Sequence, residues 1–590
     1  MNLKSFKTYD IIIIGGGGAG ACAALSSTNE NSNLKIALMD KGFFGKSGCT
    51  ILGGFSCTAV LGINPQDSVY QHFEDTVREG RYINDQNLVE IYTAKAPDRV
   101  RALHAMGPVF EAEKGNLKQK MVPGHTYPRA VYNNLHTGRS MITALQKAVF
   151  QNNIDIYNEH ITLKVICNKK VEGVLVFDIA HGELKLYACN AVIICTGGCG
   201  QLYKNSTTSM GSTGDGLALA YNAGAQMQDM EFIQFFPTAQ CYPRLLHFNS
   251  TFPSMLRYTA GCRLYNKEGQ EFMKKIPNWT YTVTRDDLSK AIYTEIKEKR
   301  GSPHGGVYMD VLHLSEKEIV DKFSFADIFN KLLRAGIDLR TDAIETTVAA
   351  HFSMGGIRVN THFQTCVTGL FAAGEAMAGI HGANRLPGNA LSEILVSGHE
   401  AGISAAHYAE KEKNKNENKK KKKPISLEVK NLLFFQYLST VQKYKEDKTY
   451  KKDEKEPLYK NKVSPSKMKE KIQKIMWEHV GVIRNGTELQ KAVDELTKIQ
   501  AMLSSMIIHT PTQSWNKELI DAFEVECMVT VGLLVAKAAL YRTESRGSHY
   551  RKDYPESDNT SWLTHIVHQK DAPMELVAPV MTKIPREEIK

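Results

Sequence analysis

The stretch that decides the fold is Asp10-Ile-Ile-Ile-Ile14 followed by Gly15-Gly-Gly17-Gly-Ala-Gly20. The apolar run predicts a buried strand, the glycines predict a tight loop, and Ala21 to Leu25 predict the start of a helix. A second apolar stretch, residues 34–39, predicts the next strand and ends at Asp40. The order of strand, glycine loop, helix and strand is typical of a doubly wound α/β sheet that binds a dinucleotide.

Each residue of this motif has a defined task. Gly15 permits the tight turn, Gly17 lets backbone N–H groups approach a pyrophosphate, and Gly20 lets the helix pack closely on the strand. Asp40 lies twenty residues beyond Gly20, where its carboxylate can accept a hydrogen bond from a ribose hydroxyl. The motif by itself fits either FAD or NAD.

The composition is that of a globular protein with several domains. The chain has 590 residues, of which 42% are hydrophobic and 23% are charged. Its longest apolar runs are interrupted by glycine well before the roughly 20 residues that a membrane-spanning helix needs. We therefore expect a cytoplasmic protein without an export signal or a membrane span of its own, held at the inner face of a membrane only through partner proteins.

Cysteine spacing and charge exclude several kinds of site. The 11 cysteines include no C-x-x-C pair and no ferredoxin-like run, so we expect reduced thiols and no iron–sulfur cluster or other metal site in this chain. Half of the net charge of +10 lies in residues 410–423, which contain eight lysines and three glutamates. Such a run is typical of a solvated linker and not of a nucleic-acid site, although a contact with a membrane surface or an acidic partner there stays open.

The predicted architecture is α/β, with a Rossmann-like dinucleotide-binding domain assembled from distant parts of the chain. Apolar runs at 191–195 and 369–374 end in glycine as the first strand does, which suits one shared sheet. An inserted α+β capping domain, a helical domain and an irregular C-terminal tail complete the chain. The expected ranges are 1–245 and 351–405 for the two parts of the dinucleotide-binding domain, 246–350 for the cap, 406–426 for the lysine-rich linker, 427–545 for the helical domain and 546–590 for the tail.

The second half of the chain separates FAD from NAD. Thr196-Gly197-Gly198, Gly214-Asp215-Gly216 and Ala373-Gly374-Glu375 occur at the spacings of flavoproteins of the two-dinucleotide type. This resemblance implies a tightly held FAD whose ribityl chain lies beside the late glycine–glutamate turn.

Further motifs of polar and charged residues follow in order. They are Glu231-Phe-Ile-Gln-Phe-Phe-Pro-Thr238, Thr284-Arg285-Asp286, His351-Phe-Ser-Met-Gly-Gly356, His381-Gly-Ala-Asn-Arg385-Leu-Pro-Gly-Asn389-Ala-Leu391, Met476-Trp-Glu-His-Val-Gly481 with Arg484, and Glu544-Ser-Arg-Gly-Ser-His-Tyr550. By these motifs the chain resembles the flavoprotein subunits of succinate dehydrogenases and fumarate reductases over nearly its whole length. The C-terminal residues 551–556 and Trp562 favour these subunits over L-aspartate oxidase.

The resemblance implies hydride transfer between FAD and a C4 dicarboxylate, with electrons exchanged through a separate iron–sulfur protein subunit. His351 and Arg385 match the residues that hold the substrate carboxylates, and Arg285 matches the arginine that gives or takes the proton. An arginine fork suits a carboxylate because it pairs with both oxygens. The cofactor-binding residues implied are Gly15, Gly17, Gly20, Asp40, Lys41, Ser47, Thr50, Gly53, Gly54, Thr196, Gly197, Asp215, Glu375, Arg385, Asn389, Ala390 and Leu391.

The chain also departs from the family pattern. Phe236 stands where many members have a histidine that contacts the substrate. Met255 and Tyr258 stand where they have the glutamate and arginine of a proton relay, and Arg257, one place away from the second of these, could substitute for that arginine. Cys49 stands where many members have the histidine that bonds covalently to the flavin, so we expect non-covalent FAD of low potential, suited to alkene reduction.

Two other functions remain open at this point. One is an L-aspartate oxidase-like or adenylylsulfate reductase-like flavoenzyme with a different substrate, which the changes at Phe236 and Met255 allow. The other is a flavin-bound assembly or redox-carrier protein without dicarboxylate turnover. The presence of Arg285, His351 and Arg385 disfavours the second.

Overall fold

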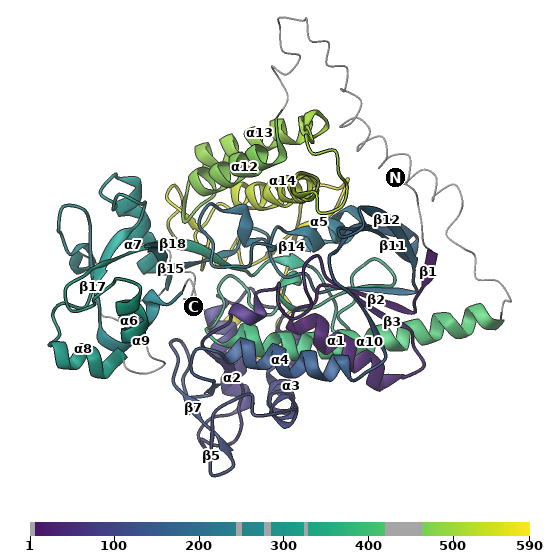
Figure 1. The fold of residues 1–590 in the computed structure, drawn as a ribbon, viewed down its shortest axis with the longest axis horizontal. Helices are drawn as coiled ribbons and strands as arrows, with labels where there is room; N and C mark the ends of the chain where they lie inside the picture. The colour runs from purple at the N-terminus through teal and green to yellow at the C-terminus, as the bar shows by residue number, and fades with distance from the viewer. Residues whose placement is uncertain (1–5, 244–250, 276–284, 324–327, 419–462, 590) are drawn as a thin grey trace, which may run out of the picture.

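A five-stranded parallel sheet forms the centre of the molecule (Figure 1). The computed structural model describes residues 6–243, 251–275, 285–323, 328–418 and 463–589. Neighbouring strands pair in parallel throughout the central sheet. In spatial order they are β20 (Leu370–Ala372), β13 (Ala191–Ile194), β2 (Ile11–Ile14), β3 (Ile36–Met39) and β9 (Ile154–Tyr157). The α/β class and the four strands expected from the sequence are confirmed, and β9 is an addition.

Helices bury this sheet. Strands β2, β3 and β13 are buried along their whole length, as expected for a parallel sheet covered on its faces. Helix α1 (Gly18–Glu30) packs along α10 (Asn389–Asn418). Two glycines of α10 allow the two backbones to lie close together. A Cβ on Gly398 would lie 2.4 Å from the carbonyl oxygen of Ala19, and one on Gly402 would lie 2.5 Å from that of Ala23. A side chain at either glycine would push the helices apart.

The linker expected at 406–426 begins too early. The first part of this expected linker is helical, since helix α10 continues to Asn418. Ala406 and Ala409 of this helix are buried against the dinucleotide-binding domain. Glu412 pairs with Lys170 at 2.6 Å, which fixes this end of the helix to strand β11 (Lys170–Asp178). Residues 419–426 lie outside the described residues.

The inserted unit is built on its own antiparallel sheet, in the order β15 (Ile233–Tyr242), β18 (Ile344–Ser353), β17 (Val307–Asp310) and β16 (Arg263–Tyr265). Helices α6 (Pro253–Ala260), α7 (Arg285–Lys297), α8 (Glu316–Phe323) and α9 (Ile328–Arg334) belong to it. Figure 1 shows this unit standing to one side of the central sheet. The sheet extends beyond the expected range 246–350 at both ends. Strand β15 lies before that range, and its partner β18 continues past residue 350 to Ser353.

Three helices of the C-terminal part pack together: α12 (Pro465–His479), α13 (Gly486–Ala501) and α14 (Lys517–Tyr541). They lie within the expected helical range 427–545, of which residues 427–462 are outside the described part. Helix α14 is buried along most of its length and also contacts α5 (Asp215–Asn222), so it joins the helical unit to the dinucleotide-binding domain. Across the described ranges, no helix has both the length and the apolar composition needed to cross a membrane.

The C-terminal tail is more regular than expected. Strand β23 (His565–His568) pairs with β14 (Met227–Gln228) and with β24 (Glu575–Val577), so residues far apart in the sequence share one sheet. Just before the tail, the buried side chain of Arg542 pairs with Glu231 at 2.6 Å and with Glu544 at 3.0 Å. The sequence predicts an irregular tail because β23 and β24 are short and because β14, the other partner of β23, lies far away in the sequence and leaves no local pattern.

Candidate active site

A cavity of about 1050 Å³ opens at the carboxyl ends of β2, β13 and β20. Ligands of open α/β sheets bind at this edge, where the strands end and the helices begin. The cavity extends from the glycine loop to the inserted unit. Among the expected site residues, those that line it are Gly15, Gly17, Asp40, Lys41, Ser47, Thr50, Gly53, Gly54, Thr196, Gly197, Asp215, Arg285, His351, Glu375, Arg385, Ala390 and Leu391.

Two expected residues do not line the cavity. A Cβ on Gly20 would lie 1.9 Å from the carbonyl oxygen of Gly15, so Gly20 serves the contact between helix and strand. Asn389 is fully buried; its Oδ1 accepts from Thr58 Oγ1 at 2.8 Å and its Nδ2 donates to Thr76 Oγ1 at 3.0 Å. Assigning Asn389 to the cofactor is therefore wrong for its side chain, which instead anchors the start of α10.

The glycine loop has the shape that a pyrophosphate requires. Gly15 has a φ of +106°, which favours glycine, and forms the tight turn after β2. Among the atoms of the described residues, a Cβ on Gly17 would have only Thr50 Oγ1 within 4 Å, at 3.6 Å, and one on Gly197 only Glu375 Oε2, at 3.9 Å. Gly17 thus leaves space at the N-terminus of α1, where backbone N–H groups and the helix dipole favour an anion, and Gly197 leaves space elsewhere in the same cavity.

Asp40 fixes the loops around this space. Its Oδ2 accepts from the backbone N–H of Gly16 and its Oδ1 from that of Gly42, each at 2.7 Å. A carboxylate oxygen can accept more than one hydrogen bond, so the expected contact with a ribose hydroxyl remains available. The structure adds a second task, which is to hold the glycine loop.

The helical unit contributes to the same cavity. Lys41 Nζ donates to Asp215 at 2.6 Å, to Thr213 at 2.8 Å and to Glu524 of α14 at 2.9 Å. Glu524 and Lys469 of α12, which also pair with each other, line the cavity. Sequence reasoning missed both residues, because nothing local shows that helices from the end of the chain reach the first domain.

His351 lies on β18 at the cap side of the cavity. Its Nδ1 is 2.7 Å from Thr207 Oγ1, and its ring centroid is 4.9 Å from that of Phe236. Burial, together with the nearby charges of Arg385 and Arg285, holds the pKa of His351 well below its usual range. The imidazole is therefore neutral at physiological pH.

Arg385 is a buried cation that faces the cavity. Its side chain donates from Nη2 to Gln234 Oε1 at 3.0 Å and lies 4.7 Å from the ring centroid of Phe352. Its Nε has no hydrogen-bond partner within the described part of the chain. Burial, and then the charge of Arg285, lowers the pKa of Arg385 to about 9. A buried cation with unused donors is suited to binding an anion.

Arg285 is the first residue of α7, and its guanidinium lies 5.4 Å from the ring centroid of Phe236. Its Nη1 is buried and, among the residues that the structure describes, has no hydrogen-bond partner. The inserted unit therefore brings Arg285 and His351 to the same cavity as Arg385. The three residues singled out from the sequence converge on one site.

The cavity wall differs from the family pattern where the sequence predicts it. Phe236 lines the cavity and presents an apolar ring, whereas Arg257 is 2% exposed and is not among the lining residues. Three hydroxyl side chains that sequence reasoning missed line the same region: Thr207, Thr251 and Ser254. No local signal marks them, because their position depends on how the inserted unit closes over the sheet.

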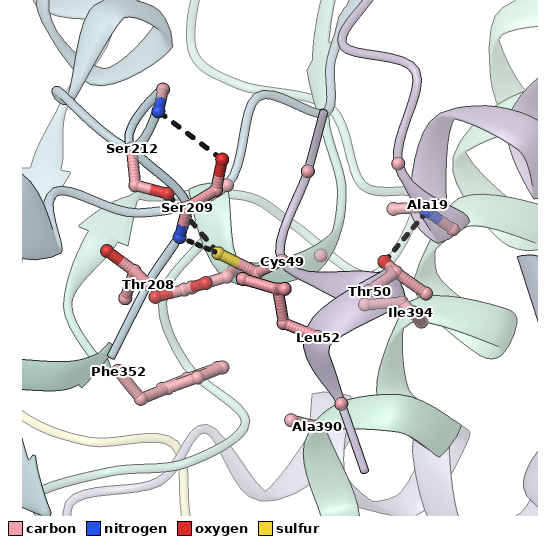
Figure 2. A pocket seen from close by; sticks show the side chains of 18 of the residues that line it. Ala19, Cys49, Thr50, Leu52, Thr208, Ser209, Ser212, Phe352, Ala390 and Ile394 are labelled. Carbon is pink, nitrogen blue, oxygen red and sulfur yellow. Dashed lines mark hydrogen bonds between the residues drawn. The ribbon is translucent and has the colours of Figure 1, made fainter. Parts of the chain in front are cut away.

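Cys49 and Thr50 lie on one short segment and point in different directions (Figure 2). Cys49 Sγ accepts from the backbone N–H of Ser209 at 3.3 Å and lies 3.2 Å from Ser212 Oγ. Thr50 Oγ1 accepts from the backbone N–H of Gly18 at 3.0 Å. Burial, with a smaller effect of Glu375, raises the pKa of the Cys49 thiol to about 11. The sulfur is therefore protonated at neutral pH and is a weak nucleophile.

Comparison with known proteins agrees with this geometry. Residues 10–391 match the model of an FAD-binding domain, and residues 469–587 match that of the fumarate reductase flavoprotein C-terminal region. The chain is 36% identical to a component of the fumarate reductase (CoM/CoB) of Methanothermobacter marburgensis, with 95% of this chain and 96% of the relative covered.

Solved structures show the same fold. A variant of FrdA from E. coli quinol fumarate reductase superposes with a TM-score of 0.86 at 26% identity, covering 99% of this chain and 98% of that one. Mycobacterium smegmatis Sdh1 in complex with UQ1 gives a TM-score of 0.84 at 32% identity, covering 98% and 94%. The fold, the cofactor cavity and both family matches agree, and the chain belongs to the FAD-dependent oxidoreductase family of fumarate reductase and succinate dehydrogenase flavoprotein subunits.

Proposed function

We propose that this flavoprotein interconverts an alkene dicarboxylate of four carbons and its saturated form, and that it exchanges electrons through a separate iron–sulfur protein. The observation that supports this best is the convergence of Arg285, His351 and Arg385 on one wall of the FAD cavity. Two cations and a neutral imidazole donor suit a substrate that carries two carboxylates. Bound FAD supplies the hydride in one direction and accepts it in the other.

The protein side chains hold the substrate and move the proton. Arg385 pairs with one carboxylate through the fork of its guanidinium. Thr207 Oγ1 lies 2.7 Å from Nδ1 of the neutral His351, and in the tautomer that accepts from Thr207 the ring presents its Nε2–H as a donor. Arg285 gives a proton to the alkene carbon that does not receive the hydride, or takes it in the reverse direction. The ring of Phe236 lies beside the Arg285 guanidinium and gives this end of the site an apolar wall.

The electron partner is part of the proposal. Solved relatives of this chain are flavoprotein subunits of multi-subunit complexes. The cysteine spacing in this chain offers no cluster motif, so electrons need a partner with its own redox centre. We propose that the complex works on the cytoplasmic side of a membrane.

An anaerobic assay tests the proposed function. Purified FAD-loaded protein is supplied with reduced viologen and either fumarate or adenylylsulfate, and in separate reactions with an artificial acceptor and either succinate or aspartate. We expect fumarate to oxidise the viologen and succinate to reduce the acceptor. Turnover of aspartate alone would indicate an L-aspartate oxidase-like enzyme, and reduction of adenylylsulfate alone would indicate an adenylylsulfate reductase-like one. No turnover with any of these substrates would favour a redox-carrier protein.

We further propose that FAD is bound without a covalent link. Cys49 occupies the position of the linking histidine and is a protonated thiol, so it lacks the nucleophilic thiolate form. Acid precipitation of the purified protein is expected to release all of the yellow cofactor into the supernatant. Flavin fluorescence that stays with the denatured polypeptide on a gel would contradict this.

Gly17→Val is expected to abolish FAD loading. Gly17 has an extended backbone, with φ −78° and ψ −170°, which valine adopts easily, so the fold tolerates the change. The new side chain instead fills the space beside the start of α1. Asp40→Ala is expected to weaken FAD binding about tenfold or more, since a charge-assisted hydrogen bond contributes roughly 1.5–3 kcal/mol.

Flavin absorbance per protein after gel filtration measures both effects. Asp98→Ala, at a carboxylate that is 75% exposed on α3 (Gln86–Ala105), is the matched control and is expected to retain full loading. Full loading of the Gly17 variant would contradict the assignment of the pyrophosphate site.

A further inference from the structure

Arg285 needs a source of protons, and the sequence lacks the glutamate and arginine that supply them in many relatives. Met255 and Tyr258 occupy those two positions, so the carboxylate and the guanidinium of that relay are both absent. Each reduced alkene consumes the proton of Arg285, so repeated turnover requires that this proton be replaced. Carboxylates in the neighbourhood of Arg285 that do not line the large cavity offer another route.

Two carboxylates, those of Glu79 and Asp286, lie close together outside the lining of the large cavity. Asn384 Nδ2 donates to Glu79 Oε1 at 2.6 Å and to Asp286 Oδ2 at 3.0 Å, so one amide group holds both. Glu79 ends helix α2 (Val69–Glu79), and Asp286 follows Arg285 in the first turn of α7. Gln234 donates to Asn384 Oδ1 at 2.8 Å and accepts from Arg385, which ties this pair to the substrate site.

The charges around the pair favour a shared proton. Burial, and then the adjacent Glu79, raises the pKa of Asp286 to about 6, although Arg81 and Lys290 oppose the shift and Asp287 adds to it. Burial also raises the pKa of Glu79, against the charges of Arg81, Arg285 and Arg385. Two adjacent buried carboxylates titrate as a unit, so one of them can carry a proton near neutral pH.

A second, small cavity lies beside Asp286. Its volume of about 10 Å³ is close to that needed for one water molecule, and Asp286, Ser289, Lys290 and Ser548 line it. Ser548 is 7% exposed, and its Oγ has no hydrogen-bond partner in the described ranges. The side chain of Lys290 is 32% exposed, so the cavity lies just beneath the surface. A water here would have polar partners on two sides.

We propose that protons enter through this water-sized cavity and pass by way of Asp286 and Glu79 to Arg285. This rests on the proposed alkene reduction. In each turnover the alkene accepts a hydride at one carbon and the Arg285 proton at the other. Glu79 then restores the proton of Arg285, Asp286 restores that of Glu79, and a solvent proton carried by the water restores that of Asp286. The route needs no further oxidant or reductant, and in the reverse direction the protons leave by the same residues.

Glu79→Gln tests the route. The amide oxygen still accepts from Asn384, so the local hydrogen bond is kept while the transferable proton is lost. In steady-state fumarate reduction with viologen, we expect kcat to fall at least about tenfold, as for loss of a proton-transfer group, with KM nearly unchanged. Glu79→Asp, which restores a carboxylate, is expected to recover part of kcat. Glu74→Gln, on the same helix at a side chain that is 36% exposed, is the matched control.

A single-turnover measurement separates proton supply from positioning. When the reduced protein is mixed with fumarate, the first turnover uses the proton already on Arg285. Glu79→Gln should therefore reoxidise its flavin at close to the wild-type rate while its kcat is low. Equal losses in both measurements would mean that Glu79 only positions the arginines, and would overturn the relay.

A change at the small cavity gives an independent check. Ser548→Val fills the space for the water and is expected to lower kcat severalfold without changing the single-turnover rate, because it acts on proton entry alone. Wild-type values of kcat in both Glu79→Gln and Ser548→Val would overturn the proposal. Failure of the wild-type protein to reduce any alkene dicarboxylate would overturn the proposed function and, with it, the relay. The assay of the wild type comes before any variant is made, so the two failures can be told apart.

Discussion

Replacing Arg285 with glutamine is expected to lower kcat for fumarate reduction by about 10²- to 10⁴-fold, the usual contribution of a positioned proton donor. Glutamine keeps a polar side chain of similar length at the start of α7 but has no proton to give. KM should change only a few fold, because Arg385 and His351 remain to hold the carboxylates. FAD stays bound, since Arg285 lies on the inserted unit and not on the glycine loop.

Steady-state kinetics with reduced viologen and the flavin content of the same preparation measure this effect. Arg285→Lys keeps a group that can give up a proton and should exceed the glutamine variant in kcat. Arg101→Gln, at a side chain that is 54% exposed on α3, is the matched control and is expected to behave as wild type. Near-native turnover of Arg285→Gln would reduce Arg285 to a structural residue, and the dicarboxylate mechanism would have to be abandoned.

Replacing Arg385 with alanine is expected to damage binding and turnover together. The variant leaves a substrate carboxylate unpaired in a buried site, a loss on the order of 3–5 kcal/mol, so kcat/KM should fall by roughly 10²- to 10³-fold or more. KM should rise strongly, in contrast to the Arg285 variant. The different balance of KM and kcat in the two variants distinguishes the carboxylate clamp from the proton donor.

The same Arg385 variant should be more stable to heat than the wild type when no substrate is present. Arg385 is buried, its pKa is lowered to about 9 by burial and by Arg285, and its Nε lacks a hydrogen-bond partner among the described side chains. A pKa lowered by burial means that the folded state disfavours the charged form of this side chain, so removing the charge favours the folded state. The thermal unfolding temperatures of both proteins measure this. A large loss of stability in the variant would mean that Arg385 stabilises the folded protein.

Local motifs determined the parts of the fold that depend on neighbouring residues. The glycine loop and the strands at 11–14 and 36–39 follow from an apolar run, three glycines and Asp40 within a short stretch, and the structure confirms them. The FAD cavity could be predicted for the same reason, since a pyrophosphate site is made of backbone groups at one turn. Arg285, His351 and Arg385 were found by resemblance to a family, because no periodicity marks a single polar residue as part of a site.

Tertiary structure alone decided what depends on contacts between distant segments. Distant partners set three features: the end of α10, the full extent of the inserted sheet and the position of β23 in the tail. The local sequence pattern near each feature does not indicate those partners. Likewise, Thr207 beside His351, Glu524 beside Lys41, and Glu79 beside Asp286 are separated by many residues and meet only when the units pack. The sequence by itself therefore determined the cofactor and the class of chemistry, because both rest on short motifs. The packing of the inserted and helical units on the central sheet decided which side chains surround the substrate and carry its protons, because burial and distance arise only from that packing.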